Sequence, residues 1–254
     1  MVSRLRLITF DATNTLLRFK ESVGKAYSGV AKLYGVSADP HHVNARFRVE
    51  FKRLAAEHPN FGSNTGMTSQ QWWAELVSRT LSGSGTISDS LMKSIAGHLY
   101  ESYRTSECWA PNAGTVETLQ RLRQSGRKLG VISNSDERLD SILAALRLRH
   151  YFDFVIASAV VKVQKPSRDI FSLALVSASG DVSLKPDDAM HVGDNIELDY
   201  LAAKRAGWNA LLLVNDESHR QRASSNGLVD PADMIQRLTD IVKVVDAQES
   251  RCAT

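Results

Sequence analysis

The pattern of apolar and polar positions divides the chain into three parts. Residues 5–10 form a short apolar run that stops at Asp11, and small and polar residues follow, so this stretch predicts a buried strand. Between residues 19 and 108, apolar positions recur near helical spacing, which predicts helices and no strand. Beyond Pro111, strand-like and helix-like segments alternate through short connections.

The predicted elements form one sheet with an insertion. Helices are expected within the insertion at about 27–34, 43–54, 69–77 and 89–104. After Pro111, the predicted helices span 114–124, 138–148, 167–179, 197–206 and 231–245, and the predicted strands span 128–133, 152–157, 189–192 and 210–214. Such alternation is typical of an α/β fold with a doubly wound parallel sheet. Since the strand at 5–10 belongs to that sheet, the helical part is inserted directly after the first strand.

Composition narrows the classes of function. The chain has 254 residues and a net charge of +3, with dispersed basic residues, so neither a nucleic-acid nor a membrane partner is expected. No apolar run approaches the roughly 20 residues that a transmembrane helix needs. The two cysteines, Cys108 and Cys252, fit a reducing compartment better than a disulfide framework. We therefore expect an intracellular protein, with the cytoplasm favoured and an organelle left open.

Polar and charged residues follow four of the predicted strands. In chain order they are Asp11, the pair Ser133 and Asn134, Lys165, and the pair Asp194 and Asp199. The carboxyl ends of parallel strands meet at the crevice where open α/β sheets bind ligands. Each feature alone has a plainer interpretation, such as a turn-capping aspartate or a helix cap. All four in order predict a site for phosphate chemistry.

These four motifs resemble those of the haloacid dehalogenase-like hydrolase superfamily. The resemblance covers essentially the whole chain, and the segments near Trp72 and Trp73 are similar to one subgroup of that superfamily. It implies a Rossmann-like core made of residues 1–18 and 109–254, and a helical cap formed by residues 19–108. The two tryptophans themselves are expected to bury an indole in the cap rather than to line a substrate pocket.

The resemblance also implies roles for the residues that follow the strands. Asp11 corresponds to the nucleophile, Ser133 holds the transferring phosphate with Asn134 beside it, and Lys165 neutralises charge. A Mg²⁺ ion is expected as the cofactor, because hard cations take oxygen ligands from carboxylates and carbonyls. Its implied ligands are Asp11, the main-chain carbonyl of Thr13, Asp194, and Asp199 directly or through water.

Thr13 departs from the family pattern. Most phosphatases of the superfamily carry an aspartate there, which protonates the leaving group and then activates water. A threonine hydroxyl performs neither task well, and such acid–base help is typically worth roughly 10²–10⁴-fold in rate. Asn14 stands where the family usually has glycine, so a displaced backbone is an open question at that position. The resemblance therefore implies slow turnover with phosphate and metal binding retained.

Four functions stay open at this point. The favoured one is a Mg²⁺-dependent hydrolase that acts on a small phosphorylated metabolite through an aspartyl-phosphate. The alternative is a catalytically weak or inactive relative that binds phosphate or serves as a scaffold. Metal-free dehalogenation is disfavoured by the paired carboxylates Asp194 and Asp199, and carbon–phosphorus cleavage needs a cap lysine, for which Lys20 and Lys25 are candidates by location alone. The sequence assigns neither the substrate nor the oligomeric state.

Overall fold

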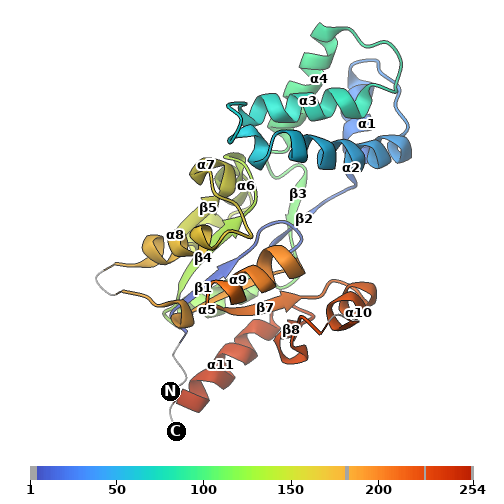
Figure 1. Ribbon diagram of the computed structural model, residues 1–254. Coiled ribbons are helices and arrows are strands. Elements are labelled where there is room, and N and C mark those ends of the chain that lie inside the picture. Colours follow the sequence, from blue (N-terminus) through green and yellow to red (C-terminus); the bar gives the residue numbers. More distant parts are fainter. Residues whose placement is uncertain (1–4, 181–182, 226, 253–254) are drawn as a thin grey trace. The chain divides into compact units, whose positions relative to one another are not determined.

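The computed structural model describes residues 5–180, 183–225 and 227–252, with side chains up to residue 247. The chain forms two compact units (Figure 1), which are described one at a time. The sheet unit contains Met1–Arg18, Pro111–Asn134 and Arg147–Thr254, and the helical unit contains Phe19–Ala110 and Ser135–Leu146. The implied cap at residues 19–108 stays a prediction as a separate moving domain.

In the described part of the sheet unit, six strands form one parallel sheet. They are β1 (Leu7–Phe10), β4 (Lys128–Ser133), β5 (Phe154–Ala157), β6 (Ala189–Gly193), β7 (Asn209–Leu213) and β8 (Met234–Ile235). Their order is β5-β4-β1-β6-β7-β8, so β1 lies at the point where the order reverses. Phe10 pairs with Val131 on one side and Val192 on the other. Strands buried on both faces read as continuous apolar runs, and β1 is buried throughout. The predicted α/β fold with a doubly wound sheet is confirmed.

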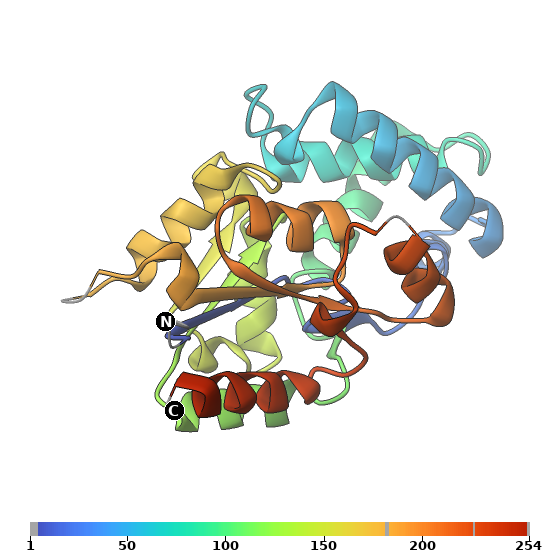
Figure 2. The same cartoon turned by 60° about the horizontal axis from the view of Figure 1, so that its bottom comes forward.

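Helices cover both faces of this sheet. Figure 2 shows α5 (Thr115–Gln124) and α11 (Asp240–Cys252) side by side on one face. On the other face, α8 (Arg168–Ala178) packs on β4 and β5, and α9 (Ala202–Arg205) packs on α8 and β7. The remaining helical segments of this unit are α7 (Ser158–Val161), α10 (Glu217–Ser225), the π-helix Ile196–Leu201, and the 3₁₀ turns Arg149–Tyr151, Pro186–Asp188 and Pro231–Asp233.

The helical unit has its own apolar core. Its helices are α1 (Val23–Leu33), α2 (Pro40–Glu57), α3 (Ser69–Leu81), α4 (Asp89–Ser102), α6 (Arg138–Ala145) and the 3₁₀ turn Asn60–Gly62. Side chains cap the N-termini, as at α3, where Thr68 and Gln71 form a capping box. Trp72 is buried as expected, and its indole N–H donates to the His58 carbonyl at 3.0 Å.

The structure corrects the last predicted helix, 231–245. Residues Pro231–Asp233 form a 3₁₀ turn, β8 follows, and α11 begins only at Asp240. Ile235 pairs with Leu213 of β7 and is buried, so its place in the core comes from a strand. A short apolar run fits a strand and a helix equally well, which is why the pattern misassigned this stretch.

Other differences lie at the edges of the predicted elements. A pair of short strands, β2 (Leu17–Phe19) and β3 (Trp109–Pro111), joins the two ends of the segment predicted to be all helical, and the rings of Phe19 and Trp109 lie 4.3 Å apart. The predicted helix 197–206 begins as a π-helix at Ile196. Among the described residues, no helix has both the length and the apolar character needed to span a membrane. Cys108 is a free thiol, and the side chain of Cys252 lies outside the described part.

Candidate active site

Asp11 leaves the carboxyl end of the central strand β1. Its main-chain N–H donates to the Val192 carbonyl at 2.9 Å, which extends the β1–β6 pairing by one residue. Its side chain is 12% exposed. Burial raises the pKa of Asp11 to about 6, although Lys165 opposes this shift and Asp199 adds to it. The sheet therefore places a carboxylate at the switch point, where ligands bind in open α/β sheets.

Lys165 is buried against Asp11. Its Nζ donates to Asp11 Oδ1 at 2.7 Å, to Asp199 Oδ1 at 2.6 Å and to the Ile132 carbonyl at 2.8 Å. An ammonium carries three protons, so these three acceptors fully determine its direction. Burial alone would lower the pKa of Lys165, but attraction by the two carboxylates outweighs burial and raises that pKa. The lysine is therefore a fixed cation beside Asp11.

Both carboxylate oxygens of Asp199 face hydrogen-bond donors. Its Oδ1 accepts from Lys165, and His191 Nε2 lies 3.2 Å from the same oxygen. Its Oδ2 accepts from the Asn195 N–H at 2.9 Å. Burial works to raise the pKa of Asp199, but Lys165 and His191 hold it well below its usual range. A side chain at Gly193 would place its Cβ 2.2 Å from Asp199 Cγ, so glycine is required there.

Three carboxylates form a group that could hold a metal ion. One oxygen from each of Asp11, Asp194 and Asp199 lies within 4.8 Å of the others. Burial, followed by repulsion from the other two carboxylates, raises the pKa of Asp194 to about 7. An all-oxygen, acidic donor set suits a hard divalent cation. The chemistry of this donor set therefore fits the expected cofactor class.

Two side chains that sequence reasoning missed face Asp194. Thr15 Oγ1 lies 3.5 Å from Asp194 Oδ1, and Asn215 Nδ2 lies 3.4 Å from Asp194 Oδ2. Both distances are at the long end for hydrogen bonds, so Asp194 is held more loosely than Asp199. Thr15 is fully buried, and Asn215 follows strand β7. Asn215 had the same signal as the predicted residues, a polar side chain just after a strand.

Ser133 and Asn134 lie where β4 ends. Ser133 is buried at the last position of the strand. The Asn134 side chain makes two bonds to the main chain of Lys165, donating to its carbonyl at 2.9 Å and accepting from its N–H at 2.8 Å. Asn134 thus fixes the loop that carries the lysine. The direct phosphate contact expected of these two residues stays a prediction.

A tight turn follows Asp11 and carries Thr13. The Ala12 carbonyl accepts from Leu17 N–H at 2.9 Å, and Asn14 N–H donates to the Leu17 carbonyl at 2.6 Å. These two hydrogen bonds form a parallel bridge through the Ala12 carbonyl and the Asn14 N–H, and they do not involve the Thr13 carbonyl. Asn14 has a φ of 63°, a left-handed conformation that glycine adopts freely and asparagine tolerates. Asparagine at this position is therefore compatible with the left-handed turn.

His191 was also missed by sequence reasoning. It lies inside the apolar run of β6 and is 1% exposed. Its Nδ1 lies 2.9 Å from Thr9 Oγ1, while its Nε2 faces Asp199. Burial lowers the pKa of His191, which favours the neutral form of the ring. A polar residue inside a strand gives no sequence signal of its own: one partner, Thr9, lies 182 residues away, and the other, Asp199, lies beyond the end of the strand.

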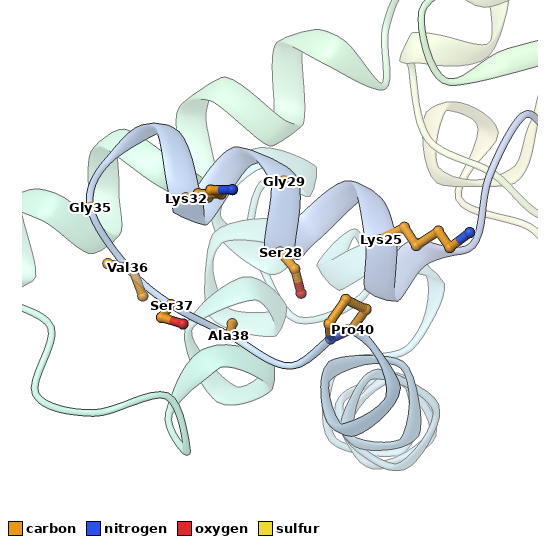
Figure 3. A pocket seen from close by; sticks show the side chains of 9 residues that line it. All are labelled: Lys25, Ser28, Gly29, Lys32, Gly35, Val36, Ser37, Ala38 and Pro40. Carbon is orange, nitrogen blue, oxygen red and sulfur yellow. The ribbon is translucent and has the colours of Figure 1, made fainter.

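The helical unit has a separate hollow of about 510 Å³ (Figure 3). It lies between α1 and the segment 35–40, and the exposed side chains of Lys25 and Lys32 border it. Apart from Lys25, which was a candidate by location alone, none of the predicted site residues lines it. The candidate active site is therefore the cluster at the carboxyl edge of the sheet.

Comparisons with known proteins show the family to which the chain belongs. A family model described as a hydrolase, haloacid dehalogenase-like hydrolase, matches residues 5–207. The chain is 42% identical over 225 residues to the rhythmically expressed gene 2 protein of Drosophila melanogaster, covering 86% of each chain. It is 35% identical over 215 residues to human haloacid dehalogenase-like hydrolase domain-containing protein 3, covering 85% of this chain and 84% of the relative. That relative represents the subgroup suggested by the segments near Trp72.

Solved structures share the fold at low identity. The L-2-haloacid dehalogenase RSc1362 has a TM-score of 0.69 and 17% identity, covering 96% of this chain and all of its own. The Bacillus subtilis protein YfnB, solved bound to magnesium, has a TM-score of 0.68 and 15% identity, with 96% and 100% coverage. A phosphatase from Thermococcus onnurineus has a TM-score of 0.59 and 20% identity, with 95% and 98% coverage. These likenesses support the Rossmann-like α/β fold.

Proposed function

Because this chain belongs to the haloacid dehalogenase-like hydrolase family, we propose that it is a Mg²⁺-dependent hydrolase that removes phosphate from a small phosphorylated molecule. One observation carries the proposal. Lys165 Nζ lies 2.7 Å from Asp11 Oδ1, and the same Asp11 belongs to an acidic group that could hold a metal ion. A carboxylate nucleophile, a fixed cation and a metal site are the parts that phosphoryl transfer needs.

The reaction proceeds in two displacements at phosphorus. In the first, an Asp11 oxygen forms a bond to phosphorus while the bond to the leaving oxygen breaks, and that oxygen takes a proton from water. In the second, a water oxygen attacks phosphorus, the bond to Asp11 breaks, and inorganic phosphate leaves. Lys165 offsets the charge on Asp11 and on the phosphoryl group, and the Ser133 hydroxyl binds a phosphoryl oxygen.

The metal would be held chiefly by Asp11, Asp194 and the carbonyl of Thr13. Asp199 would act through water, because its oxygens already accept from Lys165 and from the Asn195 N–H and lie near His191. When bound, Mg²⁺ supplies positive charge that offsets the charge on the phosphoryl oxygens. The raised pKa values of Asp11 and Asp194, about 6 and about 7, support this assignment, because a divalent cation relieves the repulsion that contributes to both shifts.

Turnover is slow because Thr13 supplies no carboxylate. The leaving oxygen must take its proton from water, and the aspartyl-phosphate must be hydrolysed without a base at this position. Substrates with good leaving groups, such as aryl or acyl phosphates, suffer least in the first step. The second step limits the rate, so the phosphoenzyme accumulates.

The departure at Thr13 favours a second candidate function. A protein that keeps Lys165, Ser133 and the acidic group but lacks the acid–base carboxylate binds phosphate without useful turnover. Such a protein serves as a phosphate-dependent binding partner or scaffold. Retention of the complete Lys165–Asp11–Asp199 ion-pair network favours the enzyme, since simple phosphate binding does not require a nucleophile.

A substrate screen tests both candidates. Purified protein is incubated with phosphorylated metabolites, aryl phosphates and acyl phosphates, with Mg²⁺ or with EDTA, and phosphate release is measured against an Asp11→Asn blank. Slow release that requires both Mg²⁺ and Asp11 supports the enzyme. Phosphate binding without any release supports the binding protein. Metal-independent halide release from 2-haloacids would show that the chain is a dehalogenase and would refute the proposal.

A further inference from the structure

His191 contacts the site without a part in the proposed reaction. It lies on β6 with its ring between Thr9 of β1 and Asp199, and the ring of Phe171 packs against it at 5.4 Å between centroids. Its two ring nitrogens therefore each face one polar partner. The imidazole and the Asp199 carboxylate are both almost completely buried.

The contacts fix which nitrogen carries the proton. An ionised carboxylate only accepts hydrogen bonds, so Nε2 must donate to Asp199 Oδ1 across the 3.2 Å between them. In the neutral ring, Nδ1 is then an acceptor, and the Thr9 hydroxyl donates a hydrogen bond to it at 2.9 Å. A directed chain of hydrogen bonds thus runs from Thr9 through His191 to Asp199.

Asp199 is the acceptor of Lys165 whose position depends on its own hydrogen-bond donors. Of the three acceptors of the lysine ammonium, the Ile132 carbonyl belongs to strand β4, and Asp11 is the group on which the lysine acts. The third is Asp199 Oδ1, a side-chain oxygen that depends on its own donors for its position. Those donors are the Asn195 N–H on Oδ2 and His191 on Oδ1.

We propose that His191 is a positioning residue for the reaction given under Proposed function, on which this inference rests: by donating to Asp199 Oδ1 it holds the Lys165 ammonium against Asp11. Without this donor, the Asp199 carboxylate can rotate about its last bond, and Lys165 loses its fixed direction. Mutation of residues that orient a binding group through a hydrogen bond commonly changes affinity or activity by about 10-fold or more. We therefore expect weaker binding of the phosphoryl group whose charge Lys165 neutralises.

Three variants separate positioning from simple loss of structure. His191→Leu removes the donor, and His191→Gln offers an amide N–H at about the place of Nε2. Phe171→Leu is the matched control, because it loosens the packing on the imidazole and leaves both of its hydrogen bonds. The probes are inorganic phosphate with saturating Mg²⁺, and Mg²⁺ alone, both followed by calorimetry on the folded protein.

We expect His191→Leu to weaken phosphate binding about 10-fold, with a smaller loss of Mg²⁺ affinity because Asp199 would reach the ion through water. His191→Gln should recover most of the phosphate affinity, and Phe171→Leu should lower the melting temperature with no change in phosphate affinity. In kinetics, His191→Leu should raise KM as well as lower kcat. Equal phosphate affinity in wild type and His191→Leu would overturn the proposal, as would losses of the same size in Phe171→Leu.

Nuclear magnetic resonance tests the same idea without any substrate. In wild type, ¹⁵N spectra of histidine should show His191 protonated on Nε2 alone, and the fully bonded Lys165 ammonium should give a resonance that disappears in Lys165→Met. That resonance should be lost or strongly shifted in His191→Leu and kept in His191→Gln. An unchanged Lys165 resonance in His191→Leu, or a His191 ring protonated on Nδ1, refutes the positioning role. This result stands even if the protein hydrolyses no phosphate ester, so the two proposals fail separately.

Discussion

Replacing Asp194 with asparagine should stabilise the metal-free protein at alkaline pH. The pKa of Asp194 is raised from 3.8 to about 7, because burial and the charges of Asp11 and Asp199 disfavour its ionised form. A group with a raised pKa in the folded state contributes stability below its unfolded pKa, and this stability is lost as the pH rises through the folded value. The metal-free wild type should therefore lose stability between about pH 4 and pH 7, and Asp194→Asn should not.

The size of the effect follows from the shift. Raising the pKa from 3.8 to about 7 spans about 3 units, which corresponds to about 4 kcal/mol at about 1.4 kcal/mol per unit. Asp194 is only partly buried, so solvent screening reduces this figure, and we take about half, or about 2 kcal/mol. For a chain of this size, that difference raises the melting temperature by about 4–8 °C.

Thermal melts of both proteins in EDTA and in Mg²⁺, at pH 5 and pH 8, provide the assay. At pH 5 the variant should melt only slightly higher than wild type, because about a third of the effect has developed, and at pH 8 in EDTA the difference should reach its full size. Saturating Mg²⁺ should reverse this order, since a ligand at 100 times its Kd adds about 2.7 kcal/mol to the protein that binds it. Replacing the exposed Asp187 with asparagine controls for general effects of charge. A wild type that melts higher than Asp194→Asn in EDTA at pH 8 would refute the reasoning.

Two further predictions concern other parts of the structure. Because the second step lacks a base, Thr13→Asp should raise kcat on aryl phosphates by about 10-fold, and Thr13→Ala should change kcat little. Burst kinetics measure both variants, with Asp11→Asn as the blank. Rapid wild-type turnover that Thr13→Ala abolishes would contradict this account. Arg138→Met should destabilise the protein by about 3–5 kcal/mol, because it leaves the buried Asp136 carboxylate without its 2.7 Å partner. Arg104→Met, at an exposed ion pair, should change stability by less than about 1 kcal/mol. Denaturant unfolding compares the two variants, and equal effects would refute the argument.

The sequence predicted the sheet and its polar edge because both leave local signals. Strands buried on two faces read as unbroken apolar runs, and each ends where polar residues begin, as at Asp11 and Ser133. Parallel pairing then requires these ends to meet at one edge. The structure brings Asp11, Lys165 and Asp199 into hydrogen-bonding contact there, although 154 residues separate the first two.

The parts that could not be predicted depend on contacts across the sheet. His191 is one polar residue in an apolar strand, and nothing in the strand itself identifies Thr9, 182 residues away, or Asp199 as its partner. The use of the Asn134 side chain to hold the Lys165 main chain is hidden for the same reason. Strand β8 was missed because two residues are too few to show a period, and only pairing with β7 identifies them.

Metal binding at this site should release protons and weaken as the pH falls. The pKa values of Asp11 and Asp194 are raised to about 6 and about 7, so near pH 6 the metal-free group holds at least one proton that a cation must displace. Calorimetric titration with Mg²⁺ in two buffers of different ionisation enthalpy measures this release directly. We expect about one proton released per ion at pH 6, almost none at pH 8.5, and an apparent affinity that falls up to about 10-fold per pH unit between them. Asp187→Asn should behave as wild type, because this exposed side chain is not a member of the acidic group. Binding with the same affinity and no proton release at pH 6 would show that the carboxylates are already ionised, and that another arrangement of charge holds the ion.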